Sequence, residues 1–233
     1  MTIYELSTEP LFPPADHAED EGLLAIGGDL SPPRLIAAYA SGIFPWPHRG
    51  MPLLWFSPDP RMVLMADEVR VSRSLRQVLR RGRFEIRLDT AFRQVMQGCA
   101  AARRKGARGT WINREMIEAY TRMHEMGFAH SAEAWHEGKL VGGLYGVSIG
   151  RAFFGESMFT TMPNASKAAF ATLVGQLDRW GIRLIDCQTH TDHLERLGAR
   201  LVPRAEFLAL LAQAVREEAP PTPWLLDAPR IAT

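Results

Sequence analysis

The sequence lacks most of the features that mark secreted, membrane-bound or disulfide-rich proteins. Its 233 residues include only two cysteines, Cys99 and Cys187, which is typical of a reducing compartment, although a single disulfide between them is an alternative. No stretch approaches the roughly 18 apolar residues of a membrane span. The first residues, MTIYELSTEP, have neither the basic start nor the apolar core of a signal peptide. We therefore expect a cytoplasmic protein with no membrane partner.

Net charge and recognisable metal-ligand spacings are also missing. The formal net charge is +1, so any nucleic-acid binding must come from local clusters of basic residues. Cys187, His190 and His193 form a short Cys-x-x-His-x-x-His run, but without a second cluster it matches zinc-ligand spacing poorly. Cys187 as a nucleophile with His193 as its base lacks an evident orienting group. We expect neither a metal nor a cofactor.

What the chain does contain is a change of pattern near residue 62. Residues 1–62 are rich in turns and proline and predict a small, loop-rich N-terminal domain with one helix, capped by Ser31 and closed by Gly42. Residues 63–233 predict a larger domain in which strands and helices surround an antiparallel hairpin. Strands are expected over residues 60–66, 84–89, 129–159 (three strands) and 182–188, and helices over 72–82, 89–101, 113–127, 164–181, 191–199 and 204–218. This order predicts a mixed α/β fold, α+β with a mixed sheet, of the GNAT acyltransferase kind.

Several segments, in order along the chain, together resemble one family, the leucyl/phenylalanyl-tRNA-protein transferases. They are GLLAIGGDLSPPRLIAAYASGIFPW (22–46), LLWFSPDPRMVL (53–64), GTWIN (109–113), LVGGLYGVSIGRAFFGESMF (140–159), NASK (164–167) and LIDCQ with DHLERLGA (184–199). The resemblance implies a two-domain enzyme, GNAT-like in its larger domain, that takes Leu, Phe or Met from an aminoacyl-tRNA. It implies transfer to proteins that begin with Arg or Lys, which marks those proteins for degradation.

A carboxylate stands inside the apolar stretch RAFFGESMF. Strand alternation predicts that Phe154, Glu156 and Met158 share one face, with the other face formed by Phe153, Gly155, Ser157 and Phe159. A carboxylate between apolar walls can hold a cation whose alkyl stem packs on Phe or Met. The alternative is a half-exposed glutamate or the partner of a structural arginine. The resemblance implies that Glu156 recognises the acceptor N-terminus.

The stretch LIDCQ repeats this arrangement. On a strand, Asp186 and Gln188 share one face, and Ile185 and Cys187 share the other. If this strand neighbours the Glu156 strand, the polar groups converge. The resemblance then implies catalytic roles, in which Asp186 orients the attacking amine and relays its proton and Gln188 holds the amine or polarises the ester carbonyl. The alternative is that Asp186 caps a helix starting near Thr189.

The remaining donor-site candidates are apolar or aromatic. The resemblance implies an aminoacyl pocket for which the candidates are Leu144, Phe153, Met158, Phe170, Leu173 and Ile185, with ordinary core packing as the alternative for each. Flexible Met158 suits a pocket that admits Leu, Phe and Met. Trp46 and Trp111 stand in loops, and the resemblance implies that they stack on the terminal adenosine of the tRNA. Packing at a domain junction is the alternative for both.

Basic residues cluster at two places. At 100° per residue the predicted helix 72–82 puts arginines on one face and Leu75, Val78 and Leu79 on the opposite face. Charge runs are usually solvated faces. For a tRNA-dependent enzyme, however, this nearly acid-free stripe predicts contacts with tRNA phosphates. The stripe consists of Arg73, Arg76, Arg80, Arg81 and Arg83. A second basic patch consists of Arg103, Arg104 and Lys105.

Two other functions fit parts of the sequence. An acetyl-CoA-dependent N-acetyltransferase would share the fold, but the junction TTMPNASK (160–167 region) lacks the glycines that usually hold a pyrophosphate before a helix. A non-catalytic RNA-binding module would explain the basic helix but leaves Glu156, Asp186 and Gln188 without a purpose. Nothing in the sequence suggests an obligate oligomer, and we expect a monomer.

Overall fold

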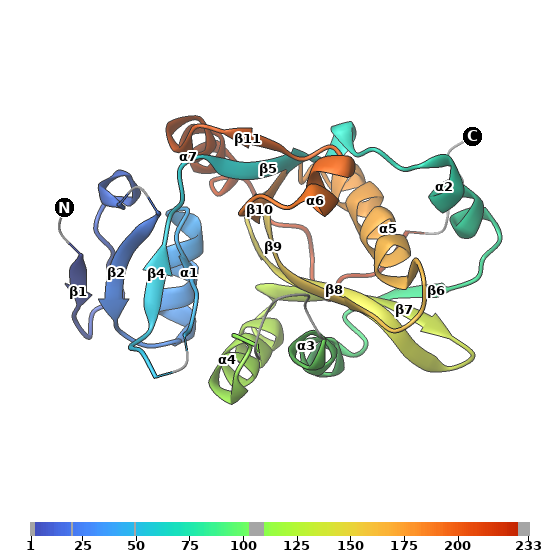
Figure 1. Ribbon diagram of the computed structural model, residues 1–233, viewed down its shortest axis with the longest axis horizontal. Helices are drawn as coiled ribbons and strands as arrows, with labels where there is room; N and C mark the ends of the chain where they lie inside the picture. The colour runs from blue at the N-terminus through green and yellow to red at the C-terminus, as the bar shows by residue number, and fades with distance from the viewer. Residues whose placement is uncertain (1–2, 20, 49, 103–109, 228–233) are drawn as a thin grey trace.

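The computed structural model describes residues 3–19, 21–48, 50–102 and 110–227 (Figure 1). Within them the chain forms a four-stranded sheet of order β1-β2-β4-β3 and a seven-stranded sheet of order β11-β5-β10-β9-β8-β7-β6. The strands are β1 (Tyr4–Leu6), β2 (Leu23–Gly27), β3 (Phe44–Pro45), β4 (Leu54–Phe56), β5 (Arg61–Met65), β6 (Glu85–Leu88), β7 (Ala129–His136), β8 (Lys139–Ile149), β9 (Ala152–Thr160), β10 (Leu184–Gln188) and β11 (Arg200–Val202). The α-helices are α1 (Pro32–Ala40), α2 (Arg73–Arg80), α3 (Phe92–Ala101), α4 (Arg114–Glu125), α5 (Ala165–Arg179), α6 (Asp192–Arg196) and α7 (Arg204–Ala214).

The N-terminal unit contains a small sheet that the sequence did not predict. β1 runs parallel to β2, β2 and β3 each pair antiparallel with β4, and α1 lies beside this sheet (Figure 1). Strands of two to five residues are too short to show alternation. Ser31 precedes α1 as predicted, but its side chain makes no capping bond; its backbone N–H donates instead to Asp29 Oδ1 at 2.7 Å.

In the larger sheet, every strand and helix predicted beyond residue 60 is present, with ends that differ by a few residues, and the short β11 is an addition. Most neighbouring strands are antiparallel, and β9 and β10 form a parallel pair. This mixed sheet with helices on both faces confirms the mixed α/β class. No helix in the described part of the chain has the length and apolar content that crossing a bilayer requires.

Two apolar cores fill the two faces of the larger sheet. On one face, here called the α4 face, α3 and α4 pack with α1 of the N-terminal unit; their core includes Tyr39, Tyr120 and Phe154. On the opposite face, called the α5 face, α5 covers the strands and α2 packs against α5; that core includes Phe153 and Ile185. Figure 1 shows the sheet between these two layers.

The parallel pair β9 and β10 separates partway along its length. Ladder pairing joins Leu184 to Ala152, Ile185 to Phe153 and Asp186 to Phe154, and it extends no further. Beyond this point β9 continues along β8 while β10 ends at Gln188. Where two strands separate, the sheet has a gap. The backbone N–H and C=O groups that lose their ladder partners there must be satisfied by side chains, ligands or water.

Both strands are irregular where they separate. Between β8 and β9 the register shifts, so that Tyr145 pairs with Ser157 and Gly146 with Gly155, leaving Glu156 without a ladder partner. Such a β-bulge moves the following side chains to the opposite face. Phe154 therefore packs on the α4 face and Met158 on the α5 face. The prediction that Phe154, Glu156 and Met158 share one face was wrong, because regular alternation ends at the bulge.

Candidate active site

A cavity of about 850 Å³ lies where β9 and β10 separate. Its wall includes Tyr145 and Phe44, which pack in the core of the α4 face, and Leu144, Phe170 and Ile185, which pack in the core of the α5 face. The cavity therefore touches residues of both layers. Its volume lies within the range of roughly 300–1,000 Å³ that is usual for small-molecule sites.

Glu156 stands in this gap, partly buried, and is held by hydrogen bonds from several elements. The Tyr39 hydroxyl on α1 donates to Glu156 Oε1 at 2.7 Å, and Gln188 Nε2 on β10 donates to the same oxygen at 2.7 Å. Tyr120 on α4 forms a short hydrogen bond with the Tyr39 hydroxyl. The side chains of Glu156 and Gln188 thus bridge the two strands after their backbone pairing has ended. Neither tyrosine was predicted as a site residue, since a tyrosine in an amphipathic helix has the pattern of a core residue.

The surroundings of Glu156 shift its ionisation toward neutral pH. Burial raises the pKa of this carboxyl group to about 7; the hydrogen bonds from Tyr39 and Gln188 oppose the rise, and the charge of Asp186 adds to it. Burial, together with the charge of Glu156, raises the pKa of Tyr39 and of Tyr120 well above the usual value. The tyrosines therefore stay protonated as donors. A cation entering the cavity would favour the ionised form of Glu156.

β10 neighbours β9 and Gln188 reaches Glu156, but Asp186 does not join them in the cavity wall. Gln188 lines the cavity, whereas the Asp186 side chain is only 1% exposed and does not line it. Asp186 accepts hydrogen bonds from Arg61 Nε at 2.9 Å, from Arg61 Nη2 at 2.6 Å and from the backbone N–H of Gln188 at 2.8 Å. Asp186 contacts Gln188 directly and acts on Glu156 through its charge, and the catalytic roles of Asp186 and Gln188 remain predictions.

The helix-cap alternative for Asp186 was wrong. The short helix that follows is α6, which begins at Asp192, and its N-cap is Thr191, whose hydroxyl accepts from the backbone N–H of Leu194 at 3.2 Å. Asp186 lies too far upstream to serve that helix. Its carboxylate instead fixes the end of β10.

Most of the apolar candidates gather on the α5 side of the cavity. Leu144, Met158, Phe170 and Ile185 line it. Phe153 and Leu173 belong to the same core but do not line the cavity. Regular alternation would put Phe153 and Met158 on opposite faces of the sheet. They share one face because of the bulge at Glu156.

Both predicted loop tryptophans line the cavity and are partly exposed. Trp46 packs against Phe44, Phe56 and His48, with ring centroids 6.4, 5.7 and 5.8 Å away. The structure thus brings Trp46 and Trp111 to the same cavity as Glu156, from segments 65 positions apart in the chain. Their role toward adenosine remains a prediction.

The basic helix has the two faces that the sequence predicts. Leu75 is buried, Val78 and Leu79 pack against the core of the α5 face, and the Ser72 hydroxyl accepts from the backbone N–H of Leu75 at 3.2 Å. The opposite face is exposed and carries Arg73, Arg76 and Arg80, with Arg81 and Arg83 following it. The second basic patch, Arg103, Arg104 and Lys105, lies outside the described residues.

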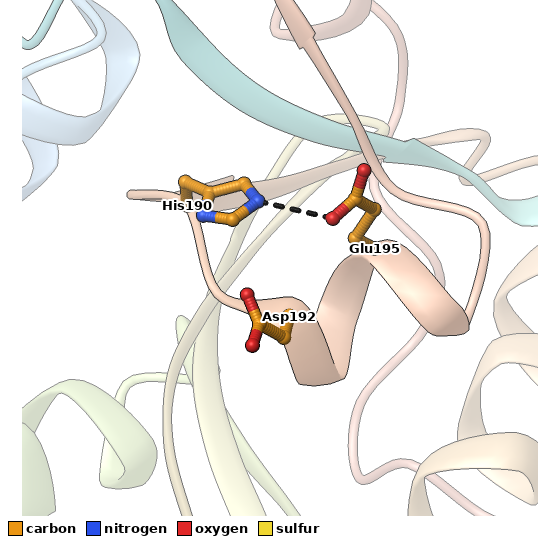
Figure 2. Close-up of side chains that lie close together, drawn as sticks. All are labelled: His190, Asp192 and Glu195. Atoms are coloured by element: carbon orange, nitrogen blue, oxygen red, sulfur yellow. Dashed lines mark hydrogen bonds and ion pairs between the residues drawn. The ribbon is translucent and has the colours of Figure 1, made fainter.

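The Cys187 region gives no support to metal or thiol chemistry. Burial, followed by the charge of Asp186, raises the pKa of the Cys187 thiol, so little thiolate is present near neutral pH. Figure 2 shows His190, Asp192 and Glu195, whose ligand atoms lie within 4.8 Å of one another, with His190 Nε2 3.2 Å from Glu195 Oε2. All three side chains are exposed, and exposed acidic groups are common without an ion. We assign no metal site to them.

The fold and the cavity define a mixed α/β protein whose candidate site opens where two parallel strands separate. The family model described as "Leucyl/phenylalanyl-tRNA protein transferase" matches residues 63–212, and the model of that family's N-terminal domain matches residues 28–59. The chain belongs to the leucyl/phenylalanyl-tRNA-protein transferase family, and it is an aminoacyltransferase.

Relatives with this family name match nearly the whole length of the chain. A leucyl/phenylalanyl-tRNA–protein transferase of Myxococcus xanthus is 57% identical over 93% of this chain and 94% of its own length. One from Nitrosospira multiformis is 57% identical over 95% of this chain and 96% of its own. A solved GCN5-related N-acetyltransferase-like protein from Streptococcus suis is 20% identical, with a TM-score of 0.34, over 61% of this chain and 59% of that one.

Proposed function

We propose that this protein transfers Leu, Phe or Met from aminoacyl-tRNA to the α-amine of proteins that begin with Arg or Lys, and so marks them for degradation. We place it in the cytoplasm as a monomer. The observation that carries the proposal is Glu156, a partly buried carboxylate in the wall of the cavity, held by Tyr39 and Gln188. Glu156 forms no ion pair within the part of the chain that the structure describes, so it suits a substrate that brings a cation.

The acceptor would enter with its cationic side chain against Glu156. Glu156 Oε1 already accepts from Tyr39 and Gln188, so its position is fixed before the substrate arrives. The reaction needs a neutral α-amine that attacks the aminoacyl ester, forms the new peptide bond and releases a ribose hydroxyl of the tRNA. Because the ester is already activated, positioning the two reactants can supply much of the rate, with about 7–11 kcal/mol available from orientation.

The donor would place its apolar side chain on the α5 side of the cavity, against Leu144, Met158, Phe170 and Ile185. An apolar pocket separates side chains that differ by one methylene by only about 1–3 kcal/mol. A methionine in the wall adapts to different shapes. We therefore expect several donor side chains to be accepted.

The nucleic-acid part of the donor would be held in two ways. Trp46 and Trp111, both in the cavity wall, offer ring faces for the terminal adenosine. The exposed arginines of α2 offer charge for phosphates of the acceptor stem, which makes binding largely independent of sequence.

One assay separates this function from the alternatives. The protein is incubated with a peptide that begins with Arg and with either labelled leucyl-tRNA or labelled acetyl-CoA. We expect label to reach the peptide from leucyl-tRNA and not from acetyl-CoA. Transfer from acetyl-CoA alone would make the protein an N-acetyltransferase, and binding of tRNA without transfer would make it a binding module.

Replacing Arg76 and Arg80 together by glutamine is expected to weaken the salt dependence of tRNA binding. Each phosphate contact contributes roughly 0.7–0.9 to the slope of log K against log salt, so losing both should flatten the slope by roughly one to two. The slope is measured by filter binding between low and physiological salt. Arg216→Gln, an exposed arginine just beyond α7, is the matched control and should leave the slope unchanged. An unaltered slope in the double variant removes α2 from the tRNA-binding surface.

A further inference from the structure

Arg61, at the start of β5, is a fully buried arginine next to the candidate site. Its guanidinium group makes a two-point ion pair with Asp186, through Nε at 2.9 Å and Nη2 at 2.6 Å. The Phe44 ring of the N-terminal unit and the Phe207 ring of α7 cover it, with centroids 4.8 and 4.7 Å from Cζ. Arg61 thus ties β5, β10, α7 and the N-terminal unit together around one carboxylate.

A hydrogen bond links this ion pair to Gln188, which lines the cavity. Asp186 Oδ1 accepts from Arg61 and also from the Gln188 backbone N–H at 2.8 Å. Gln188 has a φ of 63°, in the left-handed region that side chains other than glycine rarely adopt. A backbone in this region persists only where its surroundings hold it. The fixed carboxylate of Asp186 supplies that hold, and it lets Gln188 Nε2 reach Glu156 Oε1 at 2.7 Å.

The charged groups of this network also act on Glu156 electrostatically. Groups facing Glu156 come from every neighbouring element: Tyr39 on α1, Tyr120 on α4, Gln188 and Asp186 on β10, and Arg61 on β5, with Cys187 and His193 in the same cavity wall. The charge of Asp186 raises the pKa of Glu156, and the charge of Arg61 lowers it. The two charges therefore oppose each other as long as both are present.

We propose that Arg61 is a positioning residue of the transfer site: through Asp186 it fixes the backbone of Gln188 and keeps Glu156 available as an anion for the acceptor's cation. The proposal rests on the proposed function in its last step, the binding of the acceptor. A buried ion pair can often be replaced by apolar residues without loss of stability. In variants that fold, a purely structural Arg61 would leave the KM for the acceptor unchanged, whereas a positioning Arg61 must change it.

The test follows the ionisation of Glu156 in the free protein, by the pH titration of its ¹³C-labelled carboxyl signal, assigned by comparison with E156Q. The wild-type midpoint is expected at about 7. In Arg61→Met, with Asp186 left unbalanced, the midpoint should rise by about one unit. In Asp186→Asn it should fall, because the charge of Arg61 is then unbalanced. In the double variant it should return close to the wild-type value.

The same variants are assayed for transfer to an Arg-initiated peptide. At pH 7 the KM for the peptide should rise by about five- to tenfold in Arg61→Met, because a smaller fraction of Glu156 is ionised. Arg87→Met is the matched control, since Arg87 makes a similar two-point pair with Glu85 on the protein surface, at 2.8 and 2.9 Å, and should change neither the midpoint nor KM.

The outcomes are distinct. Unchanged midpoints in Arg61→Met and Asp186→Asn overturn the proposal, and opposite shifts support it. If Arg61→Met does not fold, the fall expected in Asp186→Asn and the recovery in the double variant still decide, and an unchanged or raised midpoint in Asp186→Asn overturns it. Because the titration uses no tRNA, a failure of the proposed function would appear in the transfer assay alone.

Discussion

Glu156→Gln is expected to lower kcat/KM for peptides that begin with Arg by roughly 30-fold or more. Glutamine can keep the hydrogen-bonded position of Glu156 but has no charge to pair with the acceptor's guanidinium group. Removing one partner of a desolvated charge pair costs about 2–5 kcal/mol, and 2 kcal/mol corresponds to roughly 30-fold. The loss is measured with leucyl-tRNA as donor. A peptide with citrulline in place of the first Arg is the control, and its transfer should be nearly the same in both proteins.

The pH profile gives a second measure of the same residue. Since the pKa of Glu156 is about 7, wild-type kcat/KM for the acceptor should rise as the pH passes through 7 and the carboxylate ionises. In Glu156→Gln that limb should disappear and only the rise from the α-amine, with a pKa of about 8, should remain. A profile that keeps the lower limb in the variant would assign it to another group and contradict a charge-based role for Glu156.

The sign of the stability effect follows from the same shift. The folded state raises the pKa of Glu156 above its unfolded value, so the protonated form is favoured by folding. That stabilisation is fully present below the unfolded pKa, near 4.5, and is lost as the pH rises through 7. The Tm of the wild type should therefore fall relative to that of Glu156→Gln between pH 5 and pH 8. A constant difference in Tm across this range would mean that Glu156 titrates as an ordinary surface carboxylate.

Asp186→Ala is expected to lower the free energy of unfolding by about 3–5 kcal/mol and to abolish most transfer activity. The substitution leaves the guanidinium group of Arg61 buried without a counter-charge, and breaking one side of a buried pair carries a cost of this size. It also removes the acceptor of the Gln188 backbone N–H, which holds the left-handed backbone at that residue. The measurement is urea denaturation beside the transfer assay.

Glu85→Ala is the comparison for this stability prediction. Glu85 also binds an arginine through two hydrogen bonds, but the Glu85–Arg87 pair is solvent-exposed. Exposed pairs contribute little to stability, so the denaturation midpoint of Glu85→Ala should stay at the wild-type value. If Asp186→Ala were to unfold at the wild-type urea concentration, leaving Arg61 without its counter-charge would not carry the cost of a buried unpaired charge.

The elements that the sequence predicts well are those with local causes. α2 is an example: the Ser72 cap, the spacing of Leu75, Val78 and Leu79, and Gly82 with a φ of 60° all lie within one short segment. Each of these signals acts between residues three or four positions apart. They need no information about the rest of the chain, and the structure shows the helix where they predict it.

The face on which each strand side chain lies was harder to predict. Period-two alternation holds along β9 until the bulge at Glu156, and then each following side chain changes face. The bulge depends on the partner strand β8, where Gly146 allows a close approach: a Cβ atom there would lie 2.3 Å from the carbonyl oxygen of Phe154. A pattern read along β9 alone does not contain that partner.

The sequence by itself determined the class of fold and the family, and it pointed to residues that line the cavity: Glu156, Gln188, the two loop tryptophans and the apolar Leu144, Met158, Phe170 and Ile185. Only the tertiary structure decided which of them share surroundings. It paired Asp186 with Arg61, and it brought Tyr39, with Tyr120 bound to it, to Glu156. It also opened the cavity where β9 and β10 separate. The physical reason is that ionisation and hydrogen bonding depend on groups distant in the chain, whereas helix and strand signals act between near neighbours.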